Sequence, residues 1–147
     1  MKIAVVTDST AYLTKEEYAE YGIYVLPMSV IFGQETYREE IDITAEEFYA
    51  KVKSSPVFPT STQPAVGETY ELFHELAKDY DAIIPITISS GISGTYQTCV
   101  AVAEDMKDEV AIYPIDSEIS CAPQARAVKL AAIMAKSGEY SPEEIVE

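Results

Sequence analysis

Short apolar runs alternate along this chain with longer amphipathic stretches, and the two patterns predict different elements. The apolar runs Lys2–Val6, Ala82–Ile88 and Val110–Ile115 have the length and β-branched content of buried strands. Helical periodicity predicts helices over residues 15–20, 45–53, 66–79, 96–106 and 124–136. Strands that alternate with helices predict an α/β fold, a mainly parallel sheet with crossover helices on both faces.

Prolines modify this pattern in two places. The apolar run Ile23–Phe32 contains Pro27, which predicts an edge position or a bent strand, and residues 36–38 form the return arm of a short hairpin. Three prolines between Ser54 and Pro64 predict a stiff loop that no helix or central strand can cross.

The ends of several predicted helices carry recognisable signals. Thr44 followed by Glu47 is a capping-box pattern, and the helix over residues 66–79 places Val66 and Tyr70 on its apolar face. Ser141 and Pro142 are typical of a helix start, and the sequence ends shortly afterwards. We therefore expect residues 1–147 to form a single α/β domain that is one half of a longer protein.

Polar clusters follow three of the predicted strands. Because ligands of open parallel sheets bind beyond the carboxyl ends of the strands, we expect these clusters to share one binding edge. The Ser61–Gln63 segment can reach the same edge. The clusters consist of Thr7, Asp8 and Ser9; Ser89, Ser90, Ser93, Gly94 and Thr95; and Asp116 and Ser117.

The Ser89–Thr95 loop is the strongest candidate for a binding site. It joins a strand to a helix, where free backbone N–H groups and the helix dipole favour an anion. Gly91 and Gly94 allow the backbone to approach a ligand closely, and the hydroxyls of the loop can donate to a carboxylate or phosphate. The alternative is an ordinary helix cap and tight turn without a ligand.

Known catalytic and phosphate-binding motifs do not fit this loop. It has no Lys for a Walker loop, and its glycines give G-x-x-G instead of a dinucleotide fingerprint or a nucleophile elbow. His74 is the only imidazole in the chain, and we expect it to be a surface or half-buried structural residue. A phosphocarrier or kinase-like domain would need Asp8 or Asp116 as nucleophile or metal ligand, but we expect both carboxylates to fix loops.

Charge and composition narrow the class of protein further. Ten basic and 25 acidic residues give a net charge of −15, which disfavours nucleic acids and anionic membranes as partners. No apolar run approaches the roughly 18 residues of a membrane span, and the first residues do not form a signal peptide. We expect a cytoplasmic bacterial protein in which Cys99 and Cys121 are buried free thiols.

Several segments, taken in order and spacing, resemble one family. The chain resembles the N-terminal domain of the DegV family of bacterial fatty-acid-binding proteins over essentially all 147 residues. The segments that carry the resemblance are Val6–Thr10, Tyr21–Ile23, Val25–Pro27, Asp42–Thr44, Glu47–Tyr49, Pro59–Pro64, Ile88–Ser90, Ser93–Gln97 and Asp116–Ser117.

The resemblance implies a lipid carrier without its own chemistry. Two α/β domains would hold one long-chain fatty acid, its chain in an apolar tunnel and its carboxylate on hydroxyls and N–H groups at the sheet edge. A partner kinase related to dihydroxyacetone kinases would then make the acyl-phosphate for phospholipid synthesis. The implied head-group residues are Ser61 or Thr62, Ser93 and Gly94. The remaining residues of the polar clusters would support them, with no catalytic residue, metal or cofactor.

The sequence departs from the family pattern at two places, and a rival function remains open. Ser61 and Thr62 stand in the reverse of the usual Thr-Ser order, and Cys121, Pro123 and Ala125 replace the usual small residues after Asp116–Ser117. A third interpretation is a structural or interaction half whose acidic face docks a partner. If a tunnel wall faces a missing second domain, we expect exposed apolar surface and self-association.

Overall fold

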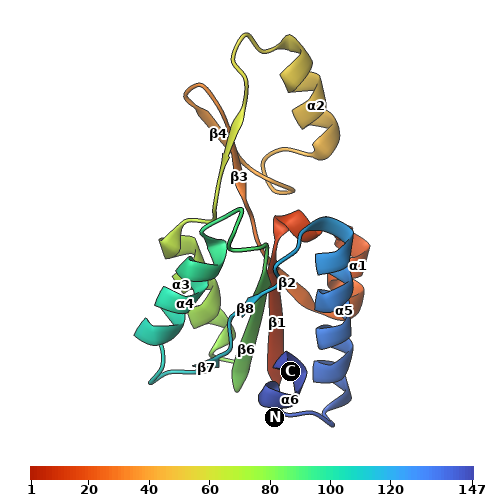
Figure 1. The fold of residues 1–147 in the computed structure, drawn as a ribbon, viewed down its shortest axis with the longest axis vertical. Coiled ribbons are helices and arrows are strands. Elements are labelled where there is room, and N and C mark those ends of the chain that lie inside the picture. Colours follow the sequence, from red (N-terminus) through yellow and green to blue (C-terminus); the bar gives the residue numbers. More distant parts are fainter.

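The computed structural model describes all 147 residues, and the chain folds into a larger and a smaller lobe (Figure 1). The larger lobe contains a sheet whose strands all pair in parallel, in the order β2-β1-β6 with β7 and then β8 along the outer side of β6. This sheet confirms the predicted α/β class. Its strands are β1 (Ile3–Asp8), β2 (Ile23–Leu26), β6 (Ala82–Thr87), β7 (Ala111–Ile112) and β8 (Ile115–Asp116).

Helices cover both faces of the parallel sheet (Figure 1). One face carries α5 together with α1 and α6, and the other carries α3 and α4. A single 3₁₀ turn, η1, follows β1 directly. The bounds are η1 (Ser9–Ala11), α1 (Lys15–Tyr21), α3 (Val66–Leu76), α4 (Thr95–Asp105), α5 (Cys121–Ser137) and α6 (Pro142–Val146).

The smaller lobe is an antiparallel sheet with one helix packed on it. Strand β3 (Ser29–Phe32) pairs with β4 (Glu35–Arg38) on one side and with β5 (Thr60–Thr62) on the other. Helix α2 (Ala45–Ser54) begins at the predicted Thr44–Glu47 capping box. A small core of Val30, Phe32 and Ile43 holds this lobe together.

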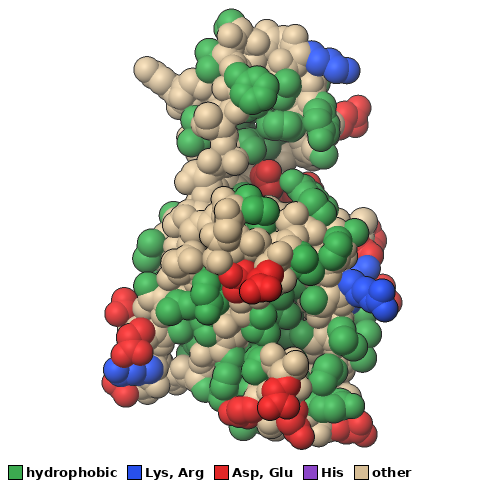
Figure 2. All heavy atoms as spheres, in the orientation of Figure 1, with side chains coloured by type: hydrophobic (Ala, Val, Ile, Leu, Met, Phe, Trp, Pro, Cys, Tyr) green, Lys and Arg blue, Asp and Glu red, His purple; other side chains and the backbone are tan.

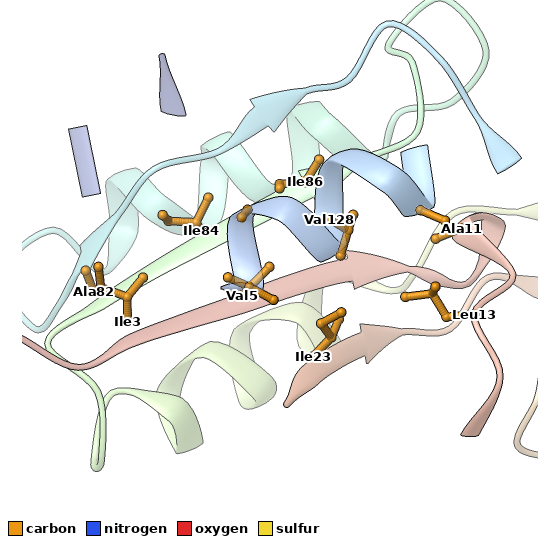
Figure 3. Close-up of a cluster of buried hydrophobic side chains, with 12 residues drawn as sticks. Ile3, Val5, Ala11, Leu13, Ile23, Ala82, Ile84, Ile86 and Val128 are labelled. Carbon is orange, nitrogen blue, oxygen red and sulfur yellow. The ribbon is translucent and has the colours of Figure 1, made fainter. Parts of the chain in front are cut away.

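The period of two along β1 divides the core of the larger lobe into two halves. Ile3 and Val5 point toward α5, where they meet Val128 (Figure 3). Ala4 and Val6 point the other way and belong to the core under α3 and α4. Because both faces are covered, β1 is buried at every position, as expected for a central parallel strand.

The predicted strand Val110–Ile115 is wrong as a continuous element. The structure has two short strands, β7 and β8, with Tyr113 and Pro114 between them. Both strands keep the same register against β6, which places Pro114 opposite Pro85. The Tyr113 N–H donates to the Ile83 carbonyl at 2.9 Å, so the backbone groups of Pro85 face this border and those of Pro114 face away from β6. Pro85 has no N–H to donate, so the hydrogen-bond ladder opens at this point.

Pro27 also divides a predicted element. The run Ile23–Phe32 forms the edge strand β2 and then β3, so the chain passes from one sheet to the other around Pro27. The proline-rich segment is not entirely loop either, because Thr60–Thr62 forms β5. That strand lies at the edge of its sheet, where a neighbouring proline is tolerated.

Val66, Tyr70 and Cys121 are exposed, although the sequence predicted them to be buried. Helix α3 buries Thr69, while Val66 and Tyr70 on the predicted apolar face are exposed. The Thr69 hydroxyl donates to the Ala65 carbonyl, which satisfies it inside the core. Cys99 is buried, but Cys121 is exposed at the first position of α5.

None of the helices combines the length and apolar character that a bilayer crossing requires.

Two residues of α3 provide a matched test of the core. Phe73 is fully buried, whereas Tyr70, one turn earlier, is 39% exposed and stacks on His74. We expect Phe73→Ala to lower the free energy of unfolding by about 3–5 kcal/mol, because it leaves a cavity. Tyr70→Ala should cost less than about 1 kcal/mol. Urea titrations followed by circular dichroism measure both, and equal losses would contradict this packing of α3.

The two thiols should react differently with a disulfide reagent. Burial raises the pKa of the Cys99 thiol to about 12, so it stays protonated and enclosed at pH 8. We expect Cys121 to react rapidly in the folded chain and Cys99 only after unfolding in guanidinium. A Cys121→Ser variant should then show no rapid reaction, and rapid labelling of that variant would place Cys99 at the surface.

Candidate functional site

The carboxyl ends of three parallel strands meet at one edge of the larger lobe. β1 ends at Asp8, β6 ends at Thr87 before the Ser89–Thr95 loop, and β8 ends at Asp116. β5 of the smaller lobe contributes to the same region, because Gln63, directly after it, donates from Nε2 to Thr98 Oγ1 in α4 at 2.9 Å. The three predicted clusters and the Ser61–Gln63 segment are therefore brought together.

The Asp8 side chain holds the loops of this edge in place through hydrogen bonds. It is fully buried, and Oδ2 accepts a hydrogen bond from the Ile88 N–H at 2.7 Å. Oδ1 accepts from the Thr10 N–H at 3.0 Å and from Gln124 Nε2 at 3.3 Å. One carboxylate thus connects the end of β1, the end of β6 and the helix α5.

Asp116 holds the outer side of the Ser89–Thr95 loop. Its Oδ1 accepts from the N–H groups of Ser90 and Glu118, both at 3.0 Å. The hydrogen bonding from Ser90 and then from the Glu118 backbone lowers the pKa of the Asp116 carboxyl, because each bond favours the ionised form. The Ser89 N–H donates to the Ile119 carbonyl at 2.9 Å, which anchors the same loop a second time.

A cavity of about 330 Å³, called here the edge cavity, opens between this loop and β5. The four predicted head-group residues Ser61, Thr62, Ser93 and Gly94 all line it. Six further residues line the cavity, and of these only Gln63 belongs to a segment that the sequence placed at this edge. These are Thr10, Met28, Glu39, Gln63, Ile88 and Ile92.

Hydrogen-bond donors converge in the edge cavity. The hydroxyls of Ser61 and Thr62 are on exposed residues and make no hydrogen bond within the chain. Gly94 is the N-cap of α4 and supplies no capping side chain, so the first N–H groups of the helix include unpaired donors. Ser93 precedes this cap, and its hydroxyl shares a 2.9 Å hydrogen bond with Thr95 Oγ1. The arrangement can hold an anion without a positively charged side chain.

A neighbouring side chain, and not the backbone conformation, leaves no room for a Cβ at position 94. The φ of Gly94, −81°, is open to any residue. A Cβ at this position, however, would overlap Gln63 Oε1 and lie 3.1 Å from Gln63 Cδ. The Gln63 side chain therefore lies against the start of α4, with its amide oxygen nearest to Gly94. Sequence reasoning could not detect this contact, because the two residues are distant in the chain.

The residues predicted as support occupy two different places. Thr7, Asp8, Ser9 and Thr95 are buried beneath the edge cavity and shape it from within the fold. Ser89, Ser90, Asp116 and Ser117 do not line the cavity and hold its loop from the outside. Neither group presents an oxygen cluster suited to a metal, and no set of three potential metal ligands occurs in the structure.

Glu39 is the one ionisable residue among those that line the edge cavity. It lies in the strand-like segment after β4, and its Oε2 accepts a hydrogen bond from Ser9 Oγ at 2.8 Å. Burial raises the pKa of the Glu39 carboxyl despite the opposing hydrogen bond from Ser9. Glu39 belongs to a run of charged residues, which is typical of an exposed surface. The sequence therefore gave no signal that Glu39 would line a cavity.

An apolar groove of about 650 Å³ lies beyond η1, between α1 and α5. Its lining includes Leu13, Leu130 and Ile133, with Arg126 and Lys129 at its side. A small hollow lies between the edge cavity and this groove. Glu39 lines both the hollow and the edge cavity, and Tyr12 lines both the hollow and the groove. Figure 2 shows hydrophobic side chains spread over both lobes on one face of the molecule, with acidic side chains among them.

Comparison with known proteins gives a consistent result over the whole chain. The model of the family described as "Uncharacterised protein, DegV family" matches residues 2–147. Protein DegV of Bacillus subtilis is 48% identical over 147 residues, which cover 100% of this chain and 52% of that protein. A DegV domain-containing protein of Halalkalibacterium halodurans is 45% identical, over 99% of this chain and 51% of that protein. The chain thus spans about half the length of these relatives.

Solved structures agree with this result. The crystal structure of DegV, described as a fatty acid binding protein from Bacillus subtilis, matches with a TM-score of 0.95 at 48% identity. The match covers 99% of this chain and 51% of that one. A stearic acid-binding protein from Eubacterium ventriosum matches with a TM-score of 0.88 at 27% identity, over 97% of this chain and 50% of that one.

The contact between Gly94 and Gln63 can be tested by a double-mutant cycle. We expect Gly94→Ala to displace the Gln63 side chain, break its bond to Thr98 and lower the free energy of unfolding by about 1–3 kcal/mol. In a Gln63→Ala background the same change should cost less than about 1 kcal/mol, the remainder of the N-cap preference.

Gly91→Ala is the matched control for this cycle. A Cβ at Gly91 meets only Ser89 Oγ at 3.4 Å, so we expect a change within about 0.5 kcal/mol. Chemical denaturation measures all four variants. Equal costs of Gly94→Ala with and without the Gln63 side chain would contradict the contact.

Proposed function

Because this chain belongs to the DegV family, we propose that it binds a long-chain fatty acid whose carboxylate lies in the edge cavity. The observation that carries the proposal is that Ser61, Thr62, Ser93 and Gly94 line one cavity at the start of α4 and bring hydroxyl and N–H donors to it. The relatives described as fatty acid binding proteins support the choice of ligand.

The head group would be held by neutral donors. Ser61 and Thr62 have free hydroxyls, and the Gly94 N–H has no partner within the chain. Thr95 donates its hydroxyl hydrogen to Met28 Sδ at 3.7 Å, and sulfur is a weak acceptor. If Thr95 donates to Ser93 instead, the Ser93 hydrogen is released for the ligand, while Ser93 Oγ still accepts from the Thr95 N–H at 3.3 Å.

The acyl chain would leave the edge cavity along apolar surface. Ile92 is 71% exposed at the cavity wall, and Tyr12 and Leu130 are exposed along the groove beyond η1. Such surface is costly to leave in water and is typical of a binding or contact face. We propose that the remaining length of the full protein forms a second domain that covers this chain, and that the isolated residues 1–147 self-associate through the same surface.

The acyl group would then pass to another protein. We propose a carrier role in which the bound acid is presented to a fatty acid kinase of the dihydroxyacetone kinase type, for phospholipid synthesis. Asp8 and Asp116 accept backbone N–H bonds that fix loops, and this supports a carrier instead of a phosphocarrier or kinase-like domain.

Ser93→Ala tests the head-group assignment. In the full-length protein we expect the affinity for palmitate to fall about tenfold or more, because a charge-assisted hydrogen bond contributes roughly 1.5–3 kcal/mol and 1.4 kcal/mol is one decade. Affinity for hexadecanol, which has no carboxylate, should fall much less. Calorimetric titration with both ligands measures the difference.

Ser90→Ala is the matched control in the same loop. The Ser90 side chain is exposed and does not line the edge cavity, so its loss should leave both affinities unchanged. If Ser93→Ala weakens acid and alcohol equally, or changes neither, Ser93 acts only on the loop. If the wild-type protein binds no fatty acid, the proposed function is wrong.

A further inference from the structure

The buried face of α5 carries one polar side chain, Gln124, at the end of the helix that lies next to the edge cavity. Resting on the proposed function, we infer that Gln124 is a positioning residue for the head group, which acts through Asp8 and Thr10 on the Ser89–Thr95 loop and on the wall of the cavity. Gln124 and Asp8 are both fully buried inside the larger lobe, so a second domain over the edge would not touch them.

Gln124 differs in character from the rest of the face that α5 packs on the sheet. Its side chain is fully buried, amide included. The other buried residues of the helix are small or aliphatic: Ala125, Val128, Ala131 and Ala132. Because a buried amide is costly unless its donors and its acceptor are satisfied, the reason for its presence lies in the polar groups that it meets.

The hydrogen-bond partners determine the orientation of the Gln124 amide. Thr7 donates its hydroxyl hydrogen to the Ile86 carbonyl at 2.8 Å, so Thr7 Oγ1 can only accept from the amide. The amide atom 3.1 Å from it is therefore Nε2, which also donates to Asp8 Oδ1 at 3.3 Å. Oε1 then faces the hydroxyl of Thr10 at 3.0 Å and accepts from it.

This amide connects α5 to two walls of the edge cavity. Thr10 lines the cavity on the side of η1, and its hydroxyl has one hydrogen for two inward acceptors, Gln124 Oε1 and Asp8 Oδ1. Asp8 in turn accepts from the N–H of Ile88, directly before the Ser89–Thr95 loop. Gln124 is thus bonded to one lining residue and, through Asp8, to the start of the loop that would hold the head group.

Loss of the amide should loosen this edge while the apolar core under α5 stays packed. An apolar side chain of similar length cannot donate to Thr7 or Asp8 and cannot accept from Thr10, so α5 no longer holds η1 and the start of the loop. Hydroxyl and N–H donors bind a carboxylate well only where they are held in the correct geometry. The acid should therefore lose affinity, and an alcohol of equal chain length should lose little.

Gln124→Met in the full-length protein tests this role, because methionine is unbranched and similar to glutamine in length. We expect the affinity for palmitate to fall about threefold or more and the affinity for hexadecanol to fall less than about twofold. Ser93→Ala, which should cost about tenfold in the wild type, should cost about threefold or less in the Gln124→Met background, because the loop is no longer held. Calorimetric titration with both ligands measures the wild type, the two single variants and the double variant.

Val128→Ala is the matched control in the same helix. Val128 is fully buried one turn after Gln124 and meets Val5 of β1 (Figure 3), so the smaller side chain leaves a cavity and lowers the free energy of unfolding. Its side chain makes no hydrogen bond, so the palmitate affinity and the effect of Ser93→Ala should both remain as in the wild type. Thermal unfolding shows whether each variant is folded at the temperature of titration, and Gln124→Leu takes the place of Gln124→Met if that variant is not.

The outcomes separate the positioning role from the proposed function. A selective loss for palmitate together with a smaller effect of Ser93→Ala supports the role of Gln124. Unchanged affinities, equal losses for acid and alcohol, an undiminished effect of Ser93→Ala, or the same changes in Val128→Ala would overturn it, since α5 would then act through stability alone. If the wild type binds no palmitate, the proposed function is wrong, and the role of Gln124 falls with it.

Discussion

The buried carboxylate of Asp8 is the constraint on which the rest of this edge depends. Its bond to the Ile88 N–H links two central strands at the point where both end, and its bonds to Thr10 and Gln124 add the turn η1 and the helix α5. A buried charge is costly unless its oxygens are satisfied, and here several donors converge on them. The loop that carries Ser93 therefore begins from a fixed backbone, which is what a site made of N–H groups and hydroxyls requires.

The edge cavity lies between two unlike layers of structure. The parallel sheet supplies a helix start with an unpaired N–H, and the antiparallel lobe supplies the hydroxyls of Ser61 and Thr62 from an edge strand. Gln63 connects the two through its bond to Thr98 and its close packing on Gly94. Neutral donors of this kind are insensitive to pH, and Glu39 is the one ionisable residue among those that line the cavity.

The sequence predicted those features that depend on local pattern. Apolar runs located β1 and β6, and the rule that ligands bind at strand carboxyl ends placed the Ser89–Thr95 loop at one edge. The family resemblance then singled out Ser61, Thr62, Ser93 and Gly94, which line one cavity there. Features that depend on partners distant in the chain were missed. The break between β7 and β8 depends on Pro85 of the neighbouring strand, and the roles of Gln63 and Glu39 arise only when the small lobe packs against the large one. Hydroxyl-rich loops are common, so their composition alone could not separate lining residues from those that only hold the loop.

The paired prolines also affect how two copies of this chain can meet. Both borders of the parallel sheet offer little backbone for a further strand. On one border β7 and β8 have two residues each, on either side of Pro114 and its neighbour Tyr113. On the opposite border β2 is four residues long and is followed by Pro27. Intermolecular strand addition, the common route to fibrous aggregates, needs a long regular border with free N–H and C=O groups. Encounters between copies at the parallel sheet are therefore limited to contacts between side chains, which reverse more easily than added strands.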